Sequence, residues 1–299
     1  MRSMSNVLFH IVVGAIVMTA LWSVLAWMLV TLFRLHSPVG RFIVFLVPLV
    51  AAFVARVRLS PGLTTEIAIV CVSVALVFLG RDVLQYLFLK KHLETEAESS
   101  EYLQAIVNEL AQPLRIPSPR ALVSNSSRVS PFTAGVGKPF IIMPYSLLTT
   151  LTESELRVLL THEMAHIRRK DILWKWILRF LRHLSFLNPV ASWSYGQLNL
   201  SLEQGSDRLT IAVTKKPGTL ARTLMKVEKY VSLVSKQGAT PIPAVISRAD
   251  SYLPTRIRAL GTAKVKQHAL VIIMKVVFIF AIFRFICFRP VKIWLALFS

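Results

Sequence analysis

Residues 162 to 166 read His-Glu-Met-Ala-His, and this string constrains the fold because its chemistry requires a helix. Side chains at positions i and i+4 of an α-helix share one face, so His162 and His166 can bind the same metal ion. Glu163 lies about 100° further round the helix, where its carboxylate reaches a metal-bound water rather than the metal. The alternative is a set of polar residues on a solvated helix face. The pattern predicts one Zn²⁺ per chain, with Glu163 as the general base.

Thr152 and Glu155 form the sequence signature of a capping box, which predicts a helix over about residues 153–170. Before it, apolar residues between 120 and 144 are interrupted by Ser, Gly and Pro. This pattern is typical of short strands joined by turns. A solvated helix with one apolar stripe is expected over residues 93–112. The sequence therefore places a small sheet before the metal helix.

A catalytic zinc ion usually takes three protein ligands and leaves a fourth position for water, so two imidazoles are not enough. After Asp171, the next two acids are Glu203 and Asp207, one helical turn apart. We predict Glu203 as the third ligand, while Asp207 could accept a hydrogen bond from the free ring N–H of a ligating histidine. The alternative is that both acids are surface residues of a helix. Cys71 and Cys287 lie in apolar runs, so nitrogen and oxygen must hold the metal.

The chain is 54% apolar and only 17% charged, which is too apolar for an ordinary soluble domain. Apolar runs of the length that a bilayer requires predict membrane-spanning helices. The fold class expected is therefore α+β: a multi-span α-helical membrane protein with an inserted domain of a small sheet and the metal helix. The predicted order is three spans in residues 1–89 (about 7–33, 40–57 and 67–89), then the domain of the metal helix in 90–268, and a fourth span with a short tail in 269–299. Because two histidines on one helix with a glutamate between them are typical of zinc peptidases, we call residues 90–268 the peptidase domain.

Basic residues flank the predicted peptidase domain on both sides. Lys90 and Lys91 follow the third span, and Lys264 and Lys266 precede the fourth. By the positive-inside rule, the domain faces the cytoplasm from the inner or plasma membrane. The net charge of +20 is explained more simply by an anionic lipid surface than by nucleic acid. We therefore expect the lipid bilayer as a partner and no nucleic acid.

Two features leave alternatives open. A helix at about residues 172–187 could lie in the membrane interface, or it could pack on the metal helix with its basic edge in water. Its basic stripe consists of Lys175, Arg179, Arg182 and His183, and His183 is a poor ligand candidate. An oxyanion in the reaction usually needs a second electrophile, for which the candidates are Tyr230, Tyr252, Arg256 and Arg258. An extended substrate could pair with a sheet edge along residues 139–144.

Several segments, in this order along the chain, resemble the zinc metallopeptidase domain of BlaR/MecR-type membrane signal transducers, the antibiotic-sensing family. The match covers roughly residues 90–235. Residues 254–260 are also similar to a segment of HtpX-type membrane proteases, which usually place more membrane sequence between the motif and the third ligand. The matching segments are Ser130 to Gly135, Pro139 to Pro144, His162 to His166 with Arg168 to Asp171, Asn188-Pro189, and Glu203 with Asp207.

This resemblance implies a gluzincin fold with His162, His166 and Glu203 on zinc and Glu163 as general base. Antibiotic-sensing members carry a large penicillin-binding domain after the last span, whereas this chain ends 11 residues after Phe288. The resemblance therefore implies no beta-lactam sensor in this polypeptide. A signal would enter through the spans, through a partner or through the state of the substrate.

Three functions are consistent with these patterns. The leading hypothesis is a membrane-bound zinc endopeptidase that acts in regulated proteolysis, for example on a cytoplasmic repressor. The first alternative is an HtpX-like protease for the quality control of membrane proteins. The second is a non-enzymatic membrane signalling relay that keeps the zinc fold as a scaffold. The expected partners are a protein or peptide substrate and either a repressor or a separate sensor protein.

Overall fold

The computed structural model describes residues 20, 23–24, 26–28, 30–31, 38–54, 61–126, 130–135, 137–185, 189–236 and 252–261. The chain divides into two compact units. One comprises residues 1–59, 187–201 and 265–299, and the other comprises residues 60–186 and 202–264. The second unit contains the His162 motif and the predicted small sheet.

In the first unit, the described elements are α2 (Pro38–Val54) and the first half of α8 (Pro189–Thr214). Phe45 on α2 meets Trp193 on α8 edge to face, with ring centroids 5.3 Å apart. The Ser23 and Ser194 hydroxyl oxygens are 3.4 Å apart. Aromatic packing thus joins α2 to α8, and the buried hydroxyl pair links Ser23, which precedes α2, to α8.

Among the residues that the structure describes, no helix combines the length and the apolar character needed to cross a bilayer. The predicted span at 40–57 overlaps α2, and the one at 67–89 falls within the long helix α3 (Pro61–Glu96). The predicted span at 7–33 lies largely outside the described residues, and the fourth span, at 269–288, lies wholly outside them. All four spans stay predictions.

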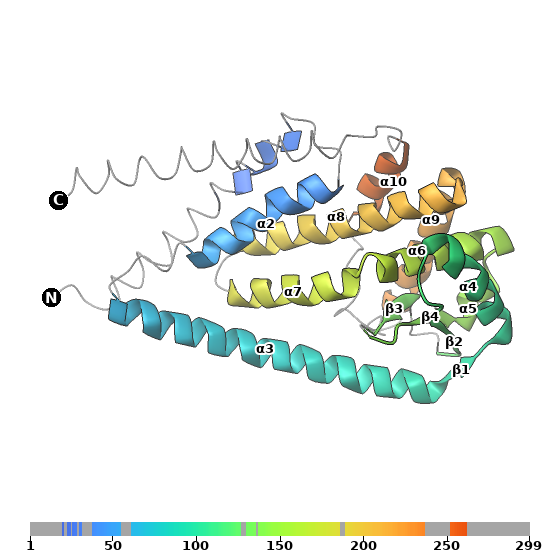
Figure 1. Cartoon of the computed structure of the whole chain (residues 1–299), viewed down its shortest axis with the longest axis horizontal. Coiled ribbons are helices and arrows are strands. Elements are labelled where there is room, and N and C mark those ends of the chain that lie inside the picture. The colour runs from blue at the N-terminus through green and yellow to red at the C-terminus, as the bar shows by residue number, and fades with distance from the viewer. Residues whose placement is uncertain are drawn as a thin grey trace. The chain divides into compact units, whose positions relative to one another are not determined.

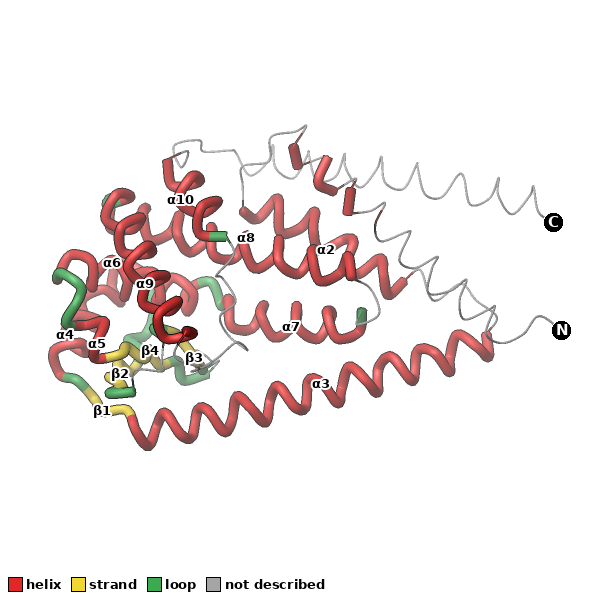
Figure 2. The backbone as a smooth tube through the Cα atoms, turned by 180° about the vertical axis from the view of Figure 1, so that it is seen from behind, coloured by secondary structure: helices red, strands yellow, loops and turns green. Residues whose placement is uncertain are grey.

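The second unit contains a four-stranded sheet in the order β1-β2-β4-β3 (Figure 2). β2 and β4 are parallel, whereas β1 pairs antiparallel with β2 and β3 pairs antiparallel with β4. The short strands expected between residues 120 and 144 are therefore confirmed. The strands are β1 (Ala97–Ser99), β2 (Arg120–Ser124), β3 (Phe132–Ala134) and β4 (Phe140–Pro144).

The predicted sheet edge along residues 139–144 is wrong, because β4 pairs with a strand on each side. All five residues of β4 are buried. A continuous apolar run of this kind is typical of an inner strand, which has no free backbone groups to offer a substrate. The outer strand on that side of the sheet is β3.

The expected helix over residues 93–112 is divided into three elements. Residues 93–96 end α3, β1 follows, and α4 (Glu101–Leu114) begins after Ser100. The Ser100 side chain accepts a hydrogen bond from the Leu103 backbone N–H, so it caps α4. The strand pairing of β1 with β2 separates the two helices.

Helices cover the sheet on both faces (Figure 1). Ala121, Ile141 and Met143 pack with α4 and with α6, the helix of the His162 motif. On the opposite face, Leu122, Phe140 and Ile142 form a second cluster against which Tyr86 of α3 packs. The remaining helices are α5 (Tyr145–Leu148), α6 (Glu153–Arg168), α7 (Asp171–Leu184), α9 (Pro217–Lys236) and α10 (Leu253–Gly261).

The N-terminus of α6 is the predicted capping box. Thr152 accepts a hydrogen bond from the Glu155 backbone N–H, and the Glu155 carboxylate accepts one from the Thr152 N–H. Lys226 of α9 donates to the same carboxylate at 2.7 Å. Burial alone would raise the pKa of Glu155, but the hydrogen bonds from Lys226 and Thr152 outweigh it and lower the pKa. The helix that carries the motif is thus fixed at its start by an ionised carboxylate.

Candidate metal centre

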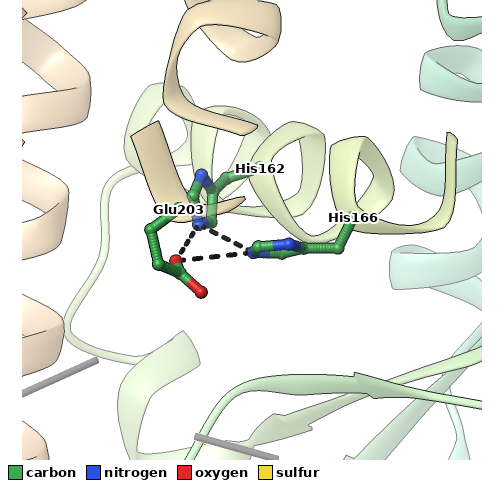
Figure 3. Close-up of side chains that lie close together, drawn as sticks. All are labelled: His162, His166 and Glu203. Carbon is green, nitrogen blue, oxygen red and sulfur yellow. Dashed lines mark hydrogen bonds and ion pairs between the residues drawn. The ribbon is translucent and has the colours of Figure 1, made fainter. Parts of the chain in front are cut away.

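Three side chains of the second unit point toward one another (Figure 3). His162 and His166 come from α6, and their Nε2 atoms are 3.3 Å apart. Glu203 comes from α8, and its Oε2 atom is 3.6 Å from each Nε2 atom. All three residues are buried, and no other group of three or more potential ligands is found among the described residues.

The spacing of these atoms fits a tetrahedral metal ion. Zinc bonds of about 2.0–2.1 Å place two ligand atoms of a tetrahedron about 3.3–3.4 Å apart. The separations of 3.3 Å and 3.6 Å lie close to that value. The donor set of two imidazoles and one carboxylate is one that zinc prefers. The residues present therefore fit the ion that the sequence predicts.

The second ring nitrogen of His166 has a carboxylate partner. His166 Nδ1 lies 2.8 Å from Asp171 Oδ2, and the Ser206 hydroxyl donates to the same oxygen at 2.9 Å. An Nδ1–H donated to Asp171 leaves the lone pair of Nε2 for a metal. Lys170, which has φ 56°, makes the turn that brings Asp171 back to His166. This contact is not among the predictions from the sequence, although a carboxylate five residues after the second histidine was a usable signal.

His162 has a different neighbour. Asp207 Oδ1 is 3.3 Å from His162 Nδ1, but the geometry is not that of a hydrogen bond, and Nδ1 is buried without a partner. Arg256 of α10 binds both oxygens of Asp207, through Nε at 2.9 Å and Nη2 at 2.8 Å. Burial alone would lower the pKa of Arg256, but Asp207 and Glu203 outweigh it and raise the pKa. The Arg256–Asp207 pair is thus a charged, bidentate contact beside the ligands.

Cationic groups surround the Glu203 carboxylate. Lys175 donates to Oε1 at 3.3 Å, and Arg256 Nη1 is 3.4 Å from Oε2. Burial would raise the pKa of Glu203, but His166, Lys175 and Arg256 hold it well below its usual range. Burial would lower the pKa of His166, yet Glu203 and Asp171 raise it to about 9. The site favours positive charge beside Glu203, a requirement that a divalent ion meets in place of a proton.

Glu163 faces a cavity of about 100 Å³ that the metal-binding set also lines. The Thr133 hydroxyl, from β3, donates to Glu163 Oε2 at 2.9 Å. β3 therefore touches the carboxylate that is predicted to act as the base. Sequence reasoning missed Thr133, because its contact depends on how the strand lies against α6.

The four candidate electrophiles lie in different places. Arg256 lines the cavity. The Tyr230 hydroxyl is 3.2 Å from that of Ser146, and its ring packs on the core between the sheet and α4. Tyr252 is half-buried and Arg258 is exposed. Among the described residues that line the cavity, Arg256 is the only one of the four.

Three of the four residues in the basic stripe of α7 point toward buried carboxylates rather than toward solvent. Lys175 reaches Glu203, while Arg179 and His183 bind Asp82 of α3. The alternative with a basic edge in water is therefore wrong for these residues, because buried carboxylates draw them inward. The solvent-accessible side of α7 carries Leu173, Trp174 and Ile177 instead. The interfacial placement stays a prediction.

Two histidines one helical turn apart, a glutamate beside them and a carboxylate from another helix are the arrangement of a metallopeptidase. The model of one protein family, described as BlaR1 peptidase M56, matches residues 50–260. Because this match covers more than half of the chain, the protein belongs to the M56 peptidase family.

Similar curated proteins fall into several groups. The plastoglobule-localized metallopeptidase 48 of Arabidopsis thaliana is 26% identical over 173 residues, covering 53% of this chain and 48% of that protein. A protease HtpX homolog of Aquifex aeolicus is 29% identical over 116 residues, which are 37% of this chain and 38% of that protein. The regulatory protein BlaR1 of Bacillus licheniformis is 29% identical over 89 residues, which are 29% of this chain and 15% of that protein. The chain thus matches about half or less of the length of each.

Proposed function

We propose that the protein is a zinc-dependent endopeptidase with its active site at His162, Glu163, His166 and Glu203. The observation that carries this proposal is the donor set, whose 3.3 Å and 3.6 Å separations suit a tetrahedral ion. Membership of a peptidase family and the buried Glu163 beside the ligands add support.

In this proposal, His162, His166 and Glu203 hold the ion, which when bound acidifies a water and polarises the scissile carbonyl. Glu163 takes a proton from the attacking water and passes it to the leaving nitrogen. Asp171 keeps His166 in the tautomer that binds through Nε2. Arg256 faces the cavity with a positive charge and is our choice for the group that stabilises the oxyanion. β3, as the outer strand at the cavity, offers its edge to an extended substrate.

Regulated proteolysis at a membrane is the biological role that we favour. A similar protein carries the printed name regulatory protein BlaR1, and the membrane-spanning helices predicted from the sequence would hold the peptidase domain at the cytoplasmic surface. The substrate would be a cytoplasmic or membrane-associated protein such as a repressor. An HtpX-like role in quality control is the second candidate, since several relatives are named protease HtpX homolog.

The test uses the purified full chain in detergent, with fluorescein-labelled casein as substrate. We expect one zinc per chain by mass spectrometry and cleavage that is lost in a Glu163→Gln variant, which keeps the ligands. Protein without zinc, or a Glu163→Gln variant as active as the wild type, would contradict the proposal. Comparing the proteins cleaved in cells that express each form then separates the two roles: a single repressor supports regulation, and many misfolded membrane proteins support quality control.

A further inference from the structure

We propose that Asp82 and Tyr86 of α3 are positioning residues for the metal centre, each acting on a different side of it. This inference rests on the proposed function. The two residues are one helical turn apart, so they lie on the same face of α3. α3 and α7 run side by side in the second unit (Figures 1 and 2). α3 also packs through Tyr86 against the sheet. One helix therefore touches both the strand beside Glu163 and the helix beside Glu203.

Tyr86 acts on the side of the general base. Its hydroxyl accepts a hydrogen bond from the Gly135 backbone N–H at 3.0 Å. Gly135 directly follows β3, and Thr133, two residues earlier, donates to the Glu163 carboxylate. The Tyr86 ring also meets Trp176 edge to face, with centroids 5.6 Å apart. Tyr86 thus fixes the end of the short strand whose hydroxyl orients Glu163.

Gly135 makes this contact specific. Its φ is +90°, and a Cβ atom there would lie 2.4 Å from the carbonyl oxygen of Lys138. A residue with this positive φ, so close to a neighbouring carbonyl oxygen, can only be glycine. The direction of the Gly135 N–H is therefore set by the loop, and the Tyr86 hydroxyl meets it from α3.

Asp82 acts on the ligand side. Its side chain is buried, and Oδ2 lies 2.8 Å from His183 Nε2 and 3.1 Å from Arg179 Nη1. Both partners are on α7, one turn apart. A buried carboxylate that loses such partners lowers the stability of the fold. The contacts of Asp82 with His183 and Arg179 therefore fix the position of α7 along α3.

α7 carries the position set by Asp82 to the metal ligands. Lys175 is one turn before Arg179 and donates to Glu203 Oε1 at 3.3 Å. Asp171, the first residue of α7, lies 2.8 Å from the His166 ring. A shift of α7 would therefore move the partners of two predicted zinc ligands, whereas the hydrogen bond of Thr133 to Glu163 is made by β3 and does not involve α7. The two routes from α3 differ in their polar contacts, and they meet only where the Tyr86 ring packs on Trp176 of α7.

The experiment compares Tyr86→Phe with Asp82→Asn in the purified full chain. Three quantities are measured: kcat on fluorescein-labelled casein, zinc affinity by competition with a chelating dye, and the visible absorption of the Co²⁺-substituted protein. The matched controls are Tyr102→Phe and Glu98→Gln, which alter exposed residues of the same types of side chain.

We expect the two variants to differ in which quantity changes. Tyr86→Phe should lower kcat about 3- to 10-fold with zinc affinity and the Co²⁺ spectrum unchanged, since one hydrogen bond that orients the base is lost. Asp82→Asn should weaken zinc binding about 3- to 10-fold and shift the Co²⁺ bands, because the outer partners of the ligands move. If Asp82→Asn does not fold, His183→Gln removes one α7 contact and should give the same ligand-side signature.

Wild-type values in both variants, or a parallel loss of kcat, metal affinity and thermal stability in both, would overturn the inference. Failure of the proposed function looks different. In that case wild type and Glu163→Gln behave alike towards casein, whereas the zinc affinity and Co²⁺ spectrum of Asp82→Asn still report on the ligand side.

Discussion

His162 and His166 are the two histidines of the motif, but their rings have different kinds of neighbour. The His166 ring contacts Asp171 and Ser206, and Asp171 follows it by five residues. The His162 ring lies beside Asp207, which is held by Arg256 of α10 at the far end of the domain. The His166 side is a hydrogen-bonded ring support. The His162 side is a buried ion pair: its Asp207 does not hydrogen bond to the ring Nδ1, while its Arg256 Nη2 lies 3.4 Å from the ring Nε2.

This difference assigns different tasks to the two sides. A hydrogen bond to the second ring nitrogen tunes metal affinity directly. A buried, bidentate ion pair affects mainly the folded state, because removing one partner leaves an uncompensated charge. We therefore expect the His166 side to control metal binding, and the His162 side to control stability and the docking of α10 in addition to the role that we propose for Arg256 at the oxyanion.

The largest effect is expected for Arg256→Met. This change leaves Asp207 buried without its bidentate partner, which should lower the free energy of unfolding by about 3–5 kcal/mol. Thermal unfolding of the purified protein measures the loss, and Arg258→Met on the same helix is the control, because Arg258 is exposed. If Arg256→Met is as stable as the control, the ion pair beside His162 does not have the structural task that we assign to it.

Asp171→Asn should affect metal binding more than stability. It removes the charged acceptor of the His166 N–H, so zinc affinity should fall about 10- to 100-fold, as measured by competition with a chelating dye. The melting temperature of the metal-free protein should change less than in Arg256→Met. Equal losses of affinity in these two variants would show that the two sides are not distinct.

How far the sequence predicts this site depends on the distance between partners. The capping box of Thr152 and Glu155 is local, and the structure confirms it. Glu203 could be chosen because acids are scarce in that part of the chain, and the structure brings it to His162 and His166. Local spacing and composition were sufficient for these features.

Other contacts could not be read from the pattern. Thr133 meets Glu163 only because the outer strand lies against α6, and no periodicity encodes that. The basic stripe predicted that these residues share one face of α7, but not what that face contacts, because Asp82, the partner of Arg179, is 97 residues away in the sequence. For β4, in contrast, the continuous apolar run was a usable sign of an inner strand.

Ser206→Ala tests the His166 side with a smaller change. The Ser206 hydroxyl donates to Asp171 Oδ2 at 2.9 Å, and the residue is fully buried. Loss of this bond should reduce zinc affinity about fivefold, equivalent to about 1 kcal/mol. Ser201→Ala is the matched control, since the hydroxyl of this buried serine on the same helix donates to the backbone carbonyl of Gln197. If both variants bind zinc as the wild type does, Ser206 does not support the ring.

Gly205→Ala should have the smallest effect, and its two consequences have opposite signs. A Cβ atom at Gly205 would collide with the guanidinium of Arg169, which donates to Asp171 Oδ1 at 3.2 Å. The flexible end of Arg169 can move away, so zinc affinity should fall only about two- to threefold. Alanine favours a helix over glycine by about 0.5–1 kcal/mol, so the metal-free protein should melt at a higher temperature. Titration with zinc and thermal unfolding of the same sample give both values. If the variant loses both stability and zinc affinity, the contact between Arg169 and Asp171 stabilises the fold. The His166 side would then have the same structural task that we assign to the ion pair beside His162.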